Sequence, residues 1–200
     1  MATANETLLD ASIKHSIGLQ RYSAGVVKQI IALLNKVDDD LVKQILKFDP
    51  TAVSGSYSRA RLEKLLEAVR AVSGEAYAAV KKELTGELKG LAVHEADFQA
   101  RMITSSIPIQ LDIVKPSASQ LYAAVKARPF QGRFLSQWFD GLEQGAQQRV
   151  ASAIKIGFVE GESIDKIIRR VRGTRSQQFR DGALEINRRG AQGVVRTAIS

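Results

Sequence analysis

Apolar side chains recur at helical spacing over two long stretches of this 200-residue chain, residues 5–35 and 74–104. In each stretch an apolar residue returns every three or four positions, apart from one step of seven, which places these side chains on one face of a helix. Thirty residues of helix extend about 45 Å, so two such helices side by side make an elongated molecule. The apolar positions are Leu9, Ile13, Ile17, Ala24, Val27, Ile31 and Leu34 in the first stretch and Tyr77, Val80, Leu84, Leu88, Leu91, Phe98 and Met102 in the second.

Turn-forming residues divide the rest of the chain into shorter elements. Three aspartates at 38–40 predict the end of the first helix and the cap of the next, and a loop is predicted around Pro50 and Gly55. Period-2 alternation over 107–114 indicates a short extended segment, which Pro108 confines to an edge position. Further helices are predicted over 40–47, 58–72, 117–128, 132–159, 163–172 and 181–200.

The sequence therefore predicts an all-α fold. We expect an elongated helical bundle with long antiparallel helices and at most one short extended segment near 107–114. The abundance of alanine, leucine, lysine, arginine and glutamate, with only 6% aromatic residues, also favours helix.

Residue types that are missing exclude several classes of protein. Because there is no cysteine, the chain has neither a disulfide framework nor a thiolate metal site. The two histidines lie far apart in sequence, and no phosphate-binding glycine loop or nucleophile elbow is present. We expect no enzyme, no cofactor and no metal. No apolar run reaches 18 residues and no secretion signal is recognisable, so we expect a soluble intracellular protein.

Charge is unevenly placed along the chain. Residues 1–100 hold 13 basic and 13 acidic residues, whereas residues 101–200 hold 16 basic and 8 acidic ones, so the second half supplies the whole net charge of +8. This shift predicts two regions, a long-helix region over 1–105 and a basic helical region over 106–200. A neutral half joined to a basic half indicates a polyanionic neighbour on one side.

Arginine is the only basic residue between 167 and 196. Its guanidinium group forms bidentate contacts with phosphate and carboxylate, whereas lysine would serve equally well for solubility. These arginines are therefore candidates for docking onto nucleic acid or a protein partner. They are Arg169, Arg170, Arg172, Arg175, Arg180, Arg188, Arg189 and Arg196.

Two alternatives remain for these arginines. They could cover a solvated helix face, with Asp165 pairing Arg169 and Glu162 pairing Lys166 at i, i+4. Alternatively they could grip a polyanion. Because few aromatic residues are interleaved, double-stranded DNA contacted without sequence specificity is a better candidate than single strands.

Several other residues carry narrower predictions. Phe130, Trp138 and Phe139 are candidate packing anchors between helices. Glu160 and Glu162 form the only acidic pair beside a glycine turn, and we interpret them as anions at a helix start rather than as a catalytic pair. The remaining predictions place His15 at the surface, Asp181 at the N-cap of the final helix, and Asp140 as a partner for Arg128 and Arg133.

Short motifs in a fixed order resemble the head morphogenesis, or minor capsid, family of tailed bacteriophages (Mu-type minor head proteins). They are A-R-P-F-Q-G-R at 127–133, E-G-E-S at 160–163, I-I-R-R-V-R-G-T-R ending at Arg175, D-G-x-L at 181–184, R-R at 188–189 and V-R-T-A at 195–198. The stretch L-K-G-L-A-V-H-E-A-D-F-Q-A-R-M at 88–102 is similar to the family's upstream helix.

The resemblance implies a structural protein present in few copies per virion. It implies a place at the portal vertex, contact with the portal protein and other head proteins, and a role in head assembly, genome packaging or genome delivery. Its locations would be the virion and, during assembly, the host cytoplasm. Related sequences continue into a further C-terminal domain, so we expect the full-length protein to extend beyond residue 200.

A second hypothesis is an internal ejection protein, released with the genome, that assembles or inserts at the host envelope. Long amphipathic helices could rearrange into a conduit, although the stripe over 77–102 is more typical of an intramolecular core. Homo-oligomerisation through the long helices is a further expectation, and binding to a membrane is not expected.

Overall fold

In the part of the chain that is described, six α-helices make up the fold and no strand occurs. The computed structural model describes residues 4–47, 59–106, 113–129 and 131–199. The helices are α1 (Ala4–Leu46), α2 (Arg59–Ser106), α3 (Ala118–Ala127), α4 (Leu135–Val159), α5 (Ile164–Arg172) and α6 (Ala183–Ile199), with a 3-10 turn, η2 (Arg175–Gln177), between the last two. The prediction of an all-α helical bundle is confirmed.

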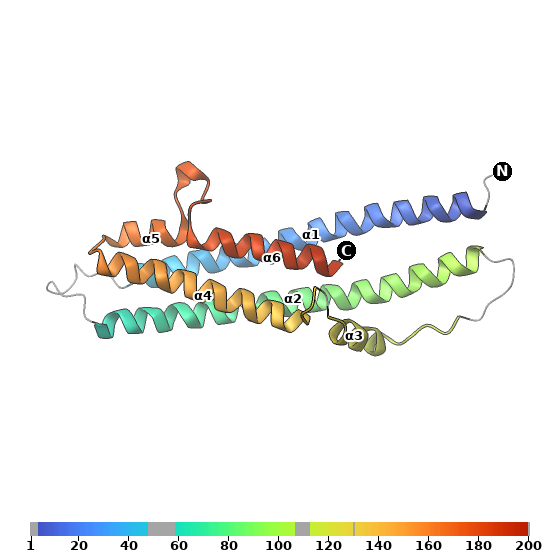
Figure 1. Cartoon of the computed structure of the whole chain (residues 1–200), viewed down its shortest axis with the longest axis horizontal. Coiled ribbons are helices and arrows are strands. Elements are labelled where there is room, and N and C mark those ends of the chain that lie inside the picture. The colour runs from blue at the N-terminus through green and yellow to red at the C-terminus, as the bar shows by residue number, and fades with distance from the viewer. Residues whose placement is uncertain (1–3, 48–58, 107–112, 130, 200) are drawn as a thin grey trace.

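The two longest helices run antiparallel along the whole molecule and give it an elongated shape (Figure 1). Helix α4 packs on α2, α6 packs on both α1 and α4, and α3 lies against α2. Beyond the end of α6, the first turns of α1 and the last turns of α2 continue as a two-helix arm (Figure 1). We define this arm as residues 5–22 and 87–106.

Two predicted helix breaks are wrong. Helix α1 continues through the three aspartates at 38–40, and α2 continues through Ser73 and Gly74. At both sites packing overrides the local preference for a helix break. The apolar residues before and after each site can be buried together only if the helix continues in the same direction. Asp38 and Ser73 are themselves buried, at 4% and 3% exposure, on the inner face of the bundle.

Two hydrophobic clusters follow one another along the hairpin of α1 and α2. One cluster holds Ile30, Val80, Leu84 and Val195, and the other holds Leu41, Leu65, Val150, Ile154 and Ile167. Both contain side chains from before and after residue 105, so the change in charge near 105 does not separate two cores.

The start of α1 departs from the predicted apolar stripe. Leu9, Ile13 and Ile17 are exposed, although their spacing predicted a buried face. The face that meets α2 carries His15 and Tyr22 instead. His15 stacks on the Phe98 ring with 3.6 Å between centroids, so the prediction that it lies at the surface is wrong. The physical reason is that α2 packs against the other side of α1, where His15 and Tyr22 lie.

The segments between the long helices agree in part with expectation. Ser117 and Gln120 form the predicted capping box of α3, with the Ser117 N–H donating to Gln120 Oε1 at 2.8 Å. Most of the predicted extended segment near 107–114, residues 107–112, lies outside the described residues, and Ile113 and Val114 have no regular secondary structure. None of the described helices is long and apolar enough to cross a membrane.

Candidate docking surface

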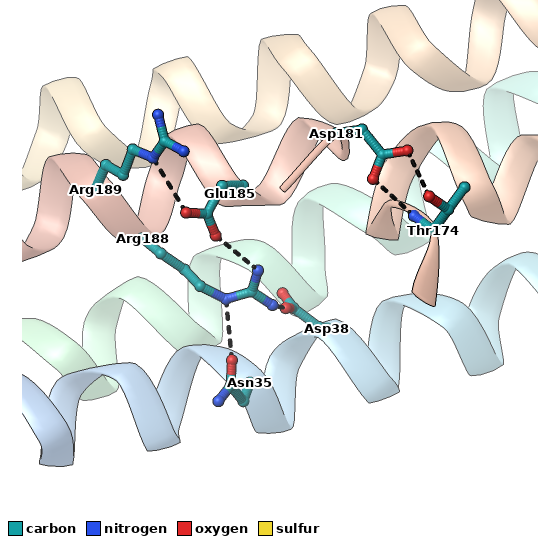
Figure 2. A network of polar contacts seen from close by, with 7 residues as sticks. All are labelled: Asn35, Asp38, Thr174, Asp181, Glu185, Arg188 and Arg189. Carbon is teal, nitrogen blue, oxygen red and sulfur yellow. Dashed lines mark hydrogen bonds and ion pairs between the residues drawn. The ribbon is translucent and has the colours of Figure 1, made fainter. Parts of the chain in front are cut away.

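The eight candidate arginines between 169 and 196 fall into two groups, those whose side chains meet a carboxylate of the same chain and those whose side chains do not. Arg188 belongs to the first group and is the most buried, with its side chain 15% exposed. Its guanidinium group donates to the Asp38 carboxylate, to Asn35 Oδ1 at 3.0 Å and to Glu185 (Figure 2). Burial lowers the pKa of Arg188 from its ordinary value, but arginine starts so far above neutral pH that the group stays charged.

Arg170 closes the turn between α4 and α5. Its Nε donates to Glu162 Oε2 at 2.6 Å and its Nη2 to Glu162 Oε1 at 2.8 Å, while Nη2 also contacts the Glu160 carboxylate. The hydrogen bond from Arg170 holds the pKa of Glu162 below its usual value. The two glutamates that the sequence placed at a helix start therefore lie together around one guanidinium group.

Two further arginines have partners at the surface. Arg172 Nη2 donates to Asp39 Oδ1 at 3.1 Å, and its guanidinium carbon lies 5.1 Å from the centre of the Phe179 ring. Arg189 Nε donates to Glu185 Oε1 at 3.1 Å, with the Arg189 side chain 66% exposed. Exposed pairs of this kind contribute little to stability, so Arg189 remains available to another partner.

The second group comprises Arg169, Arg175, Arg180 and Arg196. All four are exposed, and within the described residues none of their guanidinium groups has a hydrogen bond or an ion pair. The predicted pair of Asp165 with Arg169 is not formed within the same part of the chain. These four guanidinium groups extend from α5, through the following loop, to the end of α6.

The loop that carries Arg175 and Arg180 projects from the bundle between α5 and α6 (Figure 1). Its two ends are held together by Asp181, whose carboxylate accepts from the Thr174 N–H and from the Thr174 hydroxyl, both at 2.8 Å (Figure 2). These hydrogen bonds hold the pKa of Asp181 below its usual value. Asp181 was predicted to cap α6, but its carboxylate instead returns to the far side of the loop.

Glycine is required where the two ends of the loop cross. A Cβ on Gly182 would collide with backbone atoms of Arg172 and Gly173, and Gly173 has a φ of 93°, which favours glycine. The loop therefore leaves and returns to the bundle through a closed neck. This neck limits how far Arg175 and Arg180 can move relative to α5 and α6.

The predicted packing anchors differ in how deeply they are buried. Phe139 is buried at 3% exposure in the first cluster, and Trp138 is half-buried beside it, with the Arg133 guanidinium 5.2 Å from its ring centre. Phe130 lies outside the described residues. Asp140 meets Lys81 at 3.6 Å rather than Arg133 or Arg128.

Sequence reasoning also missed a polar contact of Arg149 in the core. Arg149 Nε donates to Asn187 Oδ1 at 2.9 Å, and Asn187 is only 3% exposed. The available signal was the position of Asn187 on the apolar side of α6, three residues after Leu184. A polar residue at such a position predicts a buried hydrogen bond.

Other kinds of site receive no support. No group of three or more acidic or histidine side chains that could hold a metal ion occurs in the described ranges. No protein-family model, curated protein or solved structure matches the chain. The resemblance to phage head proteins therefore stays a prediction from the sequence.

We predict that Arg188 and Asp38 are needed as a pair. Arg188→Met should lower the free energy of unfolding by about 3–5 kcal/mol, because it leaves the Asp38 carboxylate buried without its partner. The double variant Asp38→Leu/Arg188→Met should recover most of this loss. Chemical denaturation measures both, with the exposed Arg189→Met as control. Equal costs for Arg188→Met and Arg189→Met would contradict the pairing.

The neck of the loop gives a second prediction from two glycines. Gly182→Ala should destabilise the protein by more than about 2 kcal/mol, because its methyl group overlaps the backbone. Gly193→Ala should instead stabilise it by about 0.5–1 kcal/mol, since no atom lies within 4 Å of the new methyl group and alanine favours helix. Thermal unfolding of the two variants separates them, and stabilisation by both would show that the neck is open.

Proposed function

We propose that this chain is a structural protein of a tailed-bacteriophage head, a minor head protein that associates with the portal vertex. It would assist head morphogenesis and genome packaging or delivery without catalysing a reaction. The proposal is supported by the ordered motifs between 88 and 198 and by the elongated helical bundle. Its place would be the virion and, during assembly, the host cytoplasm.

The observation that carries the docking role is the group of four exposed arginines without a partner in the described chain. Arg170, Arg172 and Arg188 are neutralised by carboxylates of the same chain. Arg169, Arg175, Arg180 and Arg196 therefore supply positive charge that an outside partner can use. Their guanidinium groups suit phosphate oxygens, which accept paired N–H donors.

Double-stranded DNA, bound through its backbone, is the partner we propose for this surface. Stacking on single-stranded bases needs exposed aromatic rings, whereas Phe179, the aromatic residue of the loop, is half-buried against Arg172. A few arginines from two helices and a loop can contact phosphates without reading base edges. The long hairpin of α1 and α2 would then be the part that contacts the portal protein and other head proteins.

DNA binding should be weak and strongly dependent on salt. If all four arginines contact phosphates, the logarithm of the affinity should fall against the logarithm of salt concentration with a slope of about −3.6. Replacing the four by glutamine should abolish most of the binding and flatten the slope. The measurement is fluorescence anisotropy with a duplex oligonucleotide over a salt series.

A matched control replaces four exposed lysines elsewhere, Lys28, Lys64, Lys82 and Lys155, by glutamine, which changes the net charge equally. This control should keep most of the affinity. Equal loss in both variants would show a general charge effect, and absence of binding at low salt would leave a docking role towards protein only.

The virion role is tested separately, in particles that carry the chain. Immunogold labelling of purified heads should place it at one vertex, in few copies, and cross-linking with mass spectrometry should connect α1 or α2 to the portal protein. Labelling spread evenly over the shell, or found only on the tail, would contradict the proposal whatever the DNA measurement shows.

A further inference from the structure

The start of α1 presents an uncovered aliphatic stripe to solvent. Leu9, Ile13 and Ile17 are 61%, 49% and 44% exposed, and they follow one another at intervals of four residues on one face of the helix. Gln20 and Ala24, which extend the same face, are exposed as well. We define these five residues as the α1 stripe.

The neighbouring helices leave this stripe free within the described chain. Helix α2 covers another side of α1, where His15 Nε2 lies 3.0 Å from Glu95 Oε2 and the Tyr22 hydroxyl donates to the Glu87 carbonyl at 3.0 Å. Helix α6 comes near the α1 stripe at its last turn, where Ile199 borders the same hollow as Gln20 and Ala24. Three adjacent aliphatic side chains are thus exposed to water. Burying them against a partner would be favourable.

Charged residues beside the stripe are arranged in a definite order. The acidic Glu6 and Asp10 come first along the helix, and the basic Lys14 and Arg21 follow, all of them exposed. In two parallel copies of α1 related by a two-fold axis, Asp10 and Lys14 of one helix would lie on the opposite flank of the contact from Asp10 and Lys14 of the other, so these charges would not pair. In two antiparallel copies, the acidic end of each helix faces the basic end of the other.

A two-fold axis at Ile13 brings the aliphatic residues of the two copies into contact and places their opposite charges close together. Ile13 then meets Ile13 of the second copy, and Leu9 meets Ile17. Asp10 falls opposite residue 16, within one turn of Lys14 on the same flank of the stripe. The acidic first turn of the second copy falls opposite Gln20 of the first.

We propose that two copies of this chain associate antiparallel through the α1 stripe, with the two-fold axis passing at Ile13. A C2 contact of this kind uses one self-complementary surface twice. A lipid surface fits less well, because helices that lie on membranes have a mainly basic polar face, whereas this stripe is bordered by both signs of charge. The proposal goes beyond the virion role and is independent of DNA.

Single cysteines test the register, because the natural chain contains none. Under mild oxidation Ile13→Cys should form a disulfide-linked dimer by itself, whereas Leu9→Cys should form one only when mixed with Ile17→Cys. A disulfide requires Cα atoms within about 7 Å, so neighbouring registers are distinguished. Ile186→Cys, 57% exposed on α6, is the matched control and should remain monomeric.

Sedimentation equilibrium of the cysteine-free chain provides a second measurement. Asp10→Lys should raise the dissociation constant of the dimer about tenfold, because two pairs become repulsive. The double variant Asp10→Lys/Lys14→Asp should restore it. A chain that stays monomeric while Ile13→Cys fails to cross-link would overturn the proposal, as would Leu9→Cys linking to itself as fast as to Ile17→Cys. Neither result bears on DNA binding, which is measured separately.

Discussion

The whole structure depends on the apolar seam between α1 and α2. Helices of 43 and 48 residues gain most of their stability from packing, since helical hydrogen bonds exchange with hydrogen bonds to water. Ile30, Val80 and Leu84 are fully buried in this seam, as are Leu41 and Leu65 nearer its other end. The remaining helices complete the two clusters, so the hairpin determines where every side chain of the basic half lies.

The hairpin also divides the arginines into two groups. Arg172 and Arg188 reach Asp39 and Asp38, which precede them by 133 and 150 residues in the chain. Their charge is therefore neutralised by carboxylates in the first half of the chain, in which basic and acidic residues are equal in number. Arg175 and Arg180 are carried out of reach of those carboxylates by the loop that Asp181 closes. The surface available to a partner therefore contains fewer free guanidinium groups than the number of candidate arginines indicates.

Sequence periodicity predicted the helical segments but divided each of the two longest helices at a break that the structure does not have. Three aspartates in α1 and a Ser-Gly pair in α2 are ordinary signals for a break, and both were overridden because the buried stripe continues across them. The arginine candidates were all found from composition. Which of them pair could not be found, because Asp165 and Glu162 offered local partners at helical spacing. In the structure Glu162 pairs with Arg170, eight residues away, whereas Asp165 forms no ion pair within the described chain.

The sequence by itself determined the helical class and the excess of positive charge in the second half. These properties are local, since they depend on residue type and on spacing within a few turns. Only the tertiary structure decided which side of α1 is covered at Leu9, Ile13 and Ile17 and which arginines remain unpaired. Burial and ion pairing depend on which distant element lies opposite, and an apolar or charged pattern does not specify its partner.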